Sequence, residues 1–129
     1  NMMLKVALIA GFALACVSPA MAQGAPEDVI VVGVPDGGLA ARDLTAGDYA
    51  KAAKRLKAVW PDSANDPARL INLGNAYAGM GRMVDARSAY KSARFSPEMT
   101  LVMADGSEQS SRDVARRAMN RLTPVYASR

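Results

Sequence analysis

The side chains that most often carry catalysis or bind metals are scarce in this sequence. It contains no histidine and a single cysteine, Cys16. Zinc, copper and haem sites therefore lack their usual ligands, and no histidine can activate a serine or cysteine nucleophile. Asp105 and Glu108 flank a glycine turn, and a pair of carboxylates is what a glycoside hydrolase uses. Nothing around this pair indicates a sugar site, so we expect no enzyme, no catalytic residue, no bound metal and no cofactor.

Basic side chains are more frequent, and two predicted helices each gather them on one face. A solvated helix surface is the usual reason for such a run. An alternative role is the attraction of anionic envelope polymers or lipid headgroups. The net charge of +4 is too small to indicate a nucleic-acid partner, and we expect membrane contact to be peripheral at most. The two faces consist of Lys51, Lys54, Arg55 and Lys57, and of Arg112, Arg116, Arg117 and Arg121.

Residues 1–22 have the layout of a secretory signal peptide. A positive charge precedes the apolar run Val6–Val17, and Ala20–Ala22 has small residues at the two positions that a signal peptidase reads. The apolar run is too short for a membrane-spanning helix, which needs about 20 residues. We therefore expect cleavage after Ala22 and a periplasmic or secreted protein. The alternative is a lipoprotein anchored at Cys16, because the residues before this cysteine loosely resemble a lipidation motif.

The chain after residue 22 contains neither cysteine nor histidine. Without disulfides its fold has to depend on apolar burial, and about 100 residues are enough for one modest core but not for two. Composition divides this part into three regions. We expect a linker with a short extended segment in residues 23–38, helical hairpins in residues 39–98, and a turn with a C-terminal capping helix in residues 99–129.

The linker contains one apolar run, Val29–Val32, in which all four residues are β-branched. Such a run favours an extended strand, and the simplest expectation is that it packs on the first helices. A sharper hypothesis is also open. Glu27–Gly33 resembles the short strand with which many TonB-dependent outer-membrane receptors begin, and that strand pairs with the edge of a partner's sheet.

Apolar spacing and turn residues predict five helices after the linker. Gly47 and Gly81 follow the first and third of them, where a left-handed glycine commonly ends a helix. Asp66 and the proline after it form a clear helix start. Gly74 lies inside the third helix at a cost of about 1 kcal/mol against alanine, so we expect a neighbouring helix to approach it closely. The helices are expected at residues 39–46, 49–59, 67–80, 82–94, and from Ser107 or Ser110 to Leu122.

Part of the chain also matches itself. Gly47 recurs as Gly81, a spacing of about 34 residues that is typical of repeated helix-turn-helix units, and other pairs at this spacing stay apolar. Residues 67–98 resemble one full tetratricopeptide repeat, and residues 39–59 resemble a degenerate one. The aromatic residue of the family's first position is a leucine here, and the final proline falls one place early. The residues that carry the resemblance are Leu70, Leu73, Gly74, Tyr77, Gly81, Ala86, Tyr90, Ala93 and Pro97.

The resemblance implies an all-α fold of helical hairpins and a non-catalytic role in protein–protein interaction, as a module or scaffold of the cell envelope. Asparagines on the first helix of such repeats can grip the terminal carboxylate of a peptide, although a general surface or interhelical role stays open. A chain with so few repeats needs further stabilisation, either from its terminal helix or from pairing with another copy of itself. We expect Ile71, Asn75 and Ala78 to face outward. The residues assigned to a protein or peptide partner are Ile71, Asn72, Asn75 and Ala78.

Overall fold

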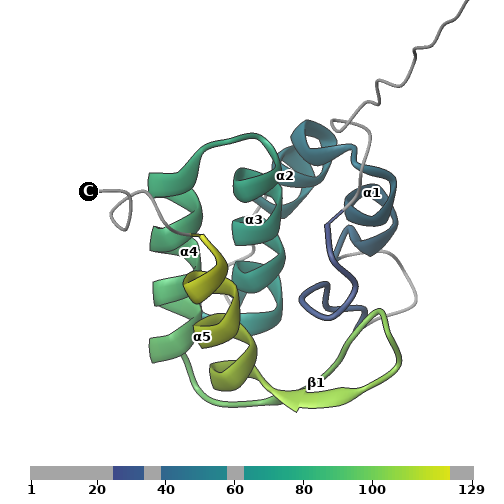
Figure 1. The fold of residues 1–129 in the computed structure, drawn as a ribbon. Helices are drawn as coiled ribbons and strands as arrows, with labels where there is room; N and C mark the ends of the chain where they lie inside the picture. The colour runs from purple at the N-terminus through teal and green to yellow at the C-terminus, as the bar shows by residue number, and fades with distance from the viewer. Residues whose placement is uncertain (1–24, 34–38, 58–62, 123–129) are drawn as a thin grey trace, which may run out of the picture.

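The computed structural model describes residues 25–33, 39–57 and 63–122. Within these residues the fold is all-α, with five helices and one small sheet (Figure 1). The expected signal peptide, with both of its candidate processing sites, and the turn at residues 35–38 lie outside the described residues. None of the described helices has the length and apolar character that crossing a membrane requires.

The first hairpin consists of α1 (Ala41–Ala46) and α2 (Tyr49–Lys57). Gly47 ends α1 in the left-handed conformation, with a φ of 83°, and its N–H bonds to carbonyl groups at the end of the helix. The helix begins later than expected because Ala40 also has a positive φ, of 55°. α2 buries one apolar stripe, and its expected end at Val59 lies outside the described residues.

The second hairpin consists of α3 (Pro67–Gly79) and α4 (Met83–Phe95). The side chain of Asp66 caps α3 by accepting a hydrogen bond of 3.0 Å from a backbone N–H of the first turn. Gly74 faces α4, and a Cβ atom at this position would lie 2.5 Å from the ring of Tyr90. The expected close approach of a neighbouring helix to Gly74 is therefore confirmed.

A β hairpin and a last helix complete the described fold. β1 (Thr100–Val102) and β2 (Glu108–Ser110) pair in antiparallel fashion, and α5 (Ser111–Arg121) follows directly. The hydroxyl of Ser110 accepts a hydrogen bond of 3.2 Å from the N–H of Arg112, so Ser110 is the cap of α5. α5 packs beside α4 (Figure 1). The last helix and its Ser110 cap agree with the sequence, whereas β2 does not follow from it, because Glu-Gln-Ser lacks residues that favour strands.

In residues 25–33, a turn at residues 27–29 is followed by an extended stretch that pairs with residues 102–104, at the end of β1 and just after it. The N–H of Val32 donates to the carbonyl of Val102, and the N–H of Ala104 donates to the carbonyl of Ile30, both at 2.8 Å. In Figure 1 this segment lies between α1 and the β hairpin. The prediction that the apolar run packs on the protein's own helices is confirmed, whereas its extended part is shorter than predicted, because Val29 still belongs to the turn.

The apolar run joins the two halves of the core. Because successive side chains of an extended segment point in opposite directions, Val29 and Val31 enter one cluster and Ile30 enters the other. The first cluster lies mainly among α3, α4 and α5, and the second among α1, α2 and α3. All three side chains are 4% exposed or less. This burial argues against the hypothesis that Glu27–Gly33 is presented as a free strand to a partner's sheet.

Candidate functional site

The asparagines expected to bind a partner are engaged by the protein's own chain. Oδ1 of Asn72 accepts a hydrogen bond of 2.9 Å from the N–H of Val31, and Nδ2 of Asn72 donates to the carbonyl of Val31 at 2.8 Å. The same Nδ2 donates to the carbonyl of Leu39 at 2.7 Å. One turn further along α3, Nδ2 of Asn75 donates to the carbonyl of Val29 at 2.7 Å. α3 therefore grips an extended backbone, and that backbone belongs to the same chain.

This arrangement corrects the placement of the α3 residues. Ile71 and Asn75 are expected to face outward but are only 0% and 2% exposed, and Asn72 is also fully buried. Ala78 is half-buried and packs against the core. The physical reason is that the apolar segment from residues 29 to 31 covers the face of α3 that the resemblance assigns to a partner.

A tyrosine of α4 completes the polar network behind these asparagines. The hydroxyl of Tyr90 donates a hydrogen bond of 2.6 Å to Oδ1 of Asn75, and Nδ2 of Asn75 also donates to Oδ1 of Asn72 at 3.2 Å. Burial raises the pKa of the Tyr90 phenol well above its ordinary value, because the charged form would lose its hydration. The neutral phenol therefore remains a donor, and the network fixes both amide orientations.

The expected anion-binding face of α5 is paired with acidic side chains. Two N–H groups of Arg121 donate to the two carboxylate oxygens of Asp28 at 2.8 and 2.6 Å, and Arg117 donates to the backbone carbonyl of Asp28 at 2.7 Å. The hydrogen bonds from Arg121 hold the pKa of Asp28 below its usual value. These contacts offset much of the positive charge on the face. The other two arginines form the pairs Arg116–Asp113, at 3.0 Å, and Arg112–Glu98, at 3.9 Å.

The expected basic face of α2 divides into two parts. Lys51 and Arg55 lie 3.8 and 3.9 Å from the carboxylate of Asp43 on α1. Lys54 and Lys57 instead border a groove between α2 and the turn that joins α3 to α4. One part of this face therefore pairs with α1 within the first hairpin, and the other part belongs to the groove.

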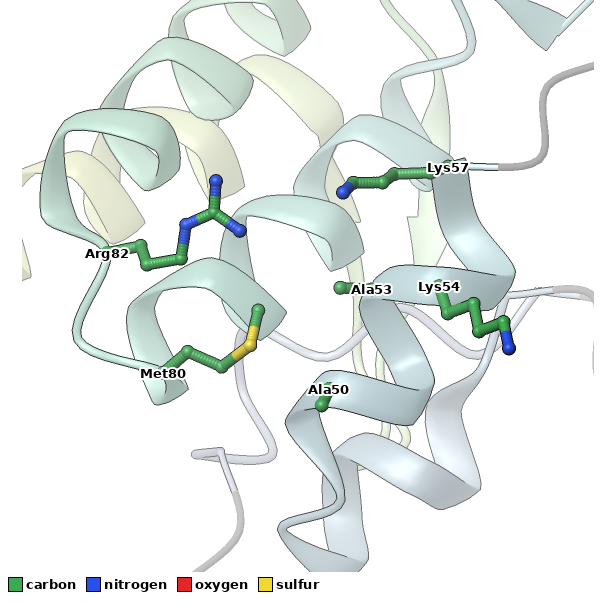
Figure 2. Close-up of a pocket in the computed structure, with 6 residues that line it drawn as sticks. All are labelled: Ala50, Ala53, Lys54, Lys57, Met80 and Arg82. Atoms are coloured by element: carbon green, nitrogen blue, oxygen red, sulfur yellow. The ribbon is translucent and has the colours of Figure 1, made fainter.

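The groove is open and has a volume of 540 Å³. Figure 2 shows Lys57 and Arg82 extending toward each other from opposite walls, while Met80 points into the space between the walls. Lys54 points away from this space and lies at the rim. The groove thus combines an apolar floor with positively charged walls. Its lining consists of Ala50, Ala53, Lys54, Lys57, Met80 and Arg82.

Two cations of the groove share one aromatic ring. The Nζ atom of Lys57 lies 6.0 Å from the centre of the Tyr77 ring, and the guanidinium carbon of Arg82 lies 4.6 Å from it. Arg82 is also held by Asp85, whose Oδ2 accepts from Nε at 2.9 Å and lies 2.6 Å from Nη2. Stacking and ion pairing together fix the Arg82 side chain at the wall.

Sequence reasoning finds only half of this groove. Lys54 and Lys57 belong to a predicted basic face, but Met80 and Arg82 lie at the turn between two helices, where the apolar period gives no information. The only sequence signal for Met80 and Arg82 is the turn at Gly81. A glycine that ends a helix predicts that the residues beside it lie at a turn. Nothing in the sequence indicates that these neighbours face Lys57.

The carboxylates considered for catalysis do not converge on a shared site. Asp105 accepts hydrogen bonds from the N–H and the hydroxyl of Ser107, at 2.9 and 2.6 Å, and both bonds lower its pKa. Glu108 is exposed on β2, opposite Val102 of β1. Across residues 25–33, 39–57 and 63–122, no cluster of three or more cysteine, aspartate or glutamate side chains is placed to hold a metal ion. Asp105 thus stabilises its own turn.

A comparison with protein families finds a match over the two helical hairpins. Residues 43–96 match the family model described as tetratricopeptide repeat. The matched residues run from within α1 to the end of α4, and exclude residues 25–33, the β hairpin and α5. No curated protein and no solved structure matches the chain. Tetratricopeptide repeats generally mediate protein–protein interaction and are typically non-catalytic. The match supports a repeat of tetratricopeptide type in residues 43–96 of this all-α fold.

Proposed function

We propose that this protein is a non-catalytic protein–protein interaction module or scaffold of the bacterial cell envelope. The tetratricopeptide-type segment at residues 43–96 supports the interaction role. The signal-peptide layout of residues 1–22 supports a periplasmic or secreted location, with cleavage after Ala22. Lipidation at Cys16 is the weaker alternative, since the residues before it match a lipidation motif only loosely.

One observation indicates which surface of the protein would bind the partner. The inner face of α3 is filled by the chain's own residues 29–31, which take the hydrogen bonds of Asn72 and Asn75. The groove between α2 and the α3–α4 turn, in contrast, is open among the described residues. Its apolar floor and fixed side chains are features of a recognition surface. We therefore assign partner binding to the groove rather than to the inner face of α3.

The partner in this proposal is another polypeptide. The two most exposed large apolar side chains of α4 are Val84, at 83%, and Phe95, at 74%, and such exposure suits contact with a second protein surface. A second copy of this chain is one candidate for that surface. The rival function is docking on anionic polymers or lipid headgroups, and it is weakened because Arg117 and Arg121 already bind Asp28.

A site-specific photocrosslink in the native host tests the assignment. A photoreactive residue replaces Ala50, an exposed residue of the groove lining, and in a second variant it replaces Asn120, which is exposed on α5. We expect a discrete protein adduct from position 50 after irradiation and none from position 120. Adducts of equal yield from both positions, or crosslinks to lipid alone, would contradict a protein-binding groove.

The location is tested separately on the same cells. We expect the protein in the envelope fraction, with a mass that corresponds to a chain starting at Gln23. A mass that corresponds to a lipidated chain starting at Cys16 would instead support a membrane-anchored lipoprotein. Recovery of the uncleaved chain from the cytoplasm would overturn the envelope location without affecting the crosslink result.

A further inference from the structure

The groove brings two positive charges toward each other from different elements. Lys57 comes from the end of α2 and Arg82 from the turn before α4, and both lie over the ring of Tyr77 at 6.0 and 4.6 Å. Figure 2 shows their charged ends converging across the groove. Like charges that face each other across a groove repel, and an anion placed between them would offset the repulsion.

The acid that is already present balances one of these charges. Asp85 contacts Arg82 through a single oxygen, Oδ2, and none of the groove's lining residues is acidic. With Lys54 at the rim, the groove therefore keeps an excess of positive charge. A guanidinium presents several N–H donors in one plane, so Arg82 can bind a second carboxylate in addition to Asp85.

The floor of the groove adds an apolar requirement. Ala50, Ala53 and Met80 form it, and methionine adapts its shape to different apolar side chains. The volume of 540 Å³ lies within the range of about 300–1,000 Å³ that is usual for ligand sites, so it accepts a few side chains rather than a whole helix face.

We propose that the groove binds an acidic segment of a protein partner, with one carboxylate between Lys57 and Arg82 and a neighbouring apolar side chain on Met80. This inference rests on the proposed function and adds the chemistry of the occupant. Charge complementarity selects the acid, and the apolar floor selects a residue beside it. Anionic lipid is the competing occupant, and the test includes it.

Fluorescence anisotropy of the protein purified from its host tests this inference. The probe is a short labelled peptide in which glutamates alternate with leucines, and its control has glutamines in place of the glutamates. The variant Lys57→Glu reverses one groove charge, and Lys91→Glu makes the same change on the exposed surface of α4, outside the groove lining. Thermal unfolding confirms that both variants fold.

We expect the acidic peptide to bind at least about tenfold more tightly than the glutamine peptide, since a 1.4 kcal/mol difference corresponds to that factor. Lys57→Glu should weaken acidic-peptide binding by about fivefold or more, and Lys91→Glu by less than about twofold. Equal binding of the two peptides, or equal losses in the two variants, would overturn the inference. Binding to phosphatidylglycerol vesicles that depends on Lys57, without peptide binding, would overturn it in favour of lipid.

The photocrosslink separates this inference from the proposed function. If Lys57→Glu leaves the protein adduct at position 50 unchanged, the groove binds a partner but does not select it by charge. In that case the proposed function stands and the acidic occupant is wrong. If no protein adduct forms at position 50 while the acidic peptide still binds in vitro, the chemistry stands and the proposed function fails.

Discussion

Asn72 binds both backbone polar groups of Val31, a residue 41 positions away in the sequence. Its amide accepts from the N–H of Val31 at 2.9 Å and donates to the carbonyl of Val31 at 2.8 Å. This is the pattern of hydrogen bonds that a neighbouring strand would provide. On its other side, the same segment pairs with residues 102–104. One buried side chain on a helix thus completes the hydrogen bonding of an extended segment.

Replacing Asn72 by alanine should destabilise the protein severely. The change removes hydrogen bonds to the N–H and carbonyl of Val31 and to the carbonyl of Leu39, in a place where Asn72 is fully buried. Each buried group left without a partner costs about 1–3 kcal/mol. We expect the free energy of unfolding to fall by about 3 kcal/mol, as measured by urea denaturation.

Two further variants show whether the cost comes from hydrogen bonding. Asn72→Asp keeps the shape of the side chain but loses its N–H donors, so we expect a loss at least as large as in Asn72→Ala. Asn120→Ala removes an exposed asparagine of α5 and should change stability by less than about 0.5 kcal/mol. A loss in Asn72→Ala no greater than in Asn120→Ala would show that residues 29–31 are not held through this side chain.

Replacing Tyr90 by phenylalanine tests the other end of the network. The hydroxyl of Tyr90 donates to Oδ1 of Asn75 at 2.6 Å, and this oxygen is buried. Without the hydroxyl, we expect the free energy of unfolding at pH 7 to fall by about 1–2 kcal/mol. Urea denaturation of the two proteins measures the difference, and equal stabilities would contradict it.

The advantage of tyrosine over phenylalanine at position 90 should depend on pH. Burial raises the pKa of the folded Tyr90 phenol above the value of 10.0 for a free tyrosine. The extra stability is therefore fully present below pH 10 and is lost as the pH rises above it, because the unfolded phenol ionises first. We expect the difference between the two proteins to shrink by about 1.4 kcal/mol per pH unit above pH 10. A constant difference would contradict a buried neutral phenol.

The helices could be predicted from the sequence because each has a local signal. Asp66 caps α3 and Gly47 ends α1 through contacts within a few residues, so the residue types suffice. Gly74 indicated a close neighbour because glycine is unfavourable inside a helix. β2 could not be predicted, since its place depends on pairing with β1 rather than on its own composition.

The candidate site was harder to predict because coverage of a face is a tertiary property. The spacing of Ile71 and Asn75 placed them on one side of α3, but it could not show that residues 29–31 cover this side. The same limit applies to the α5 arginines, whose acidic partner Asp28 lies 93 residues before Arg121. The groove joins α2 to a turn, and no periodicity connects Lys57 with Arg82.

Two glycines of α3 offer a matched test of helix packing. A Cβ atom at Gly74 would lie 2.5 Å from the ring of Tyr90, and a Cβ atom at Gly79 would lie 2.3 Å from the ring of Tyr49. Tyr90 is buried and bound to Asn75, whereas Tyr49 is only half-buried at the start of α2. We expect Gly74→Ala to cost about 1–3 kcal/mol, and Gly79→Ala clearly less, in urea denaturation. The reverse order would contradict the tight α3–α4 contact.

The ion pair between Asp28 and Arg121 should give a small, pH-dependent contribution to stability. Two N–H groups of Arg121 bind the carboxylate of Asp28 at 2.8 and 2.6 Å, and the Asp28 side chain is 36% exposed. Solvent screening at this exposure limits the contribution, so we expect Asp28→Asn to cost less than about 1 kcal/mol at pH 7. Urea denaturation measures this cost. In a protein that already carries Arg121→Gln, the further change Asp28→Asn should cost much less, because the ion pair is already absent.

The pH dependence of this pair follows from the direction of the pKa shift. Arg121 lowers the pKa of folded Asp28 below the ordinary value of 3.8, so the unfolded carboxylate takes up a proton first as the pH falls. The contribution is therefore present above about pH 4 and is lost as the pH falls from there through the folded pKa. We expect the stability difference between the natural protein and Asp28→Asn to stay constant from pH 7 to about pH 5 and to shrink below pH 4. A difference that persists unchanged at about pH 2 would contradict a contribution from the charge of Asp28, because Asp28→Asn leaves the backbone carbonyl that binds Arg117 in place.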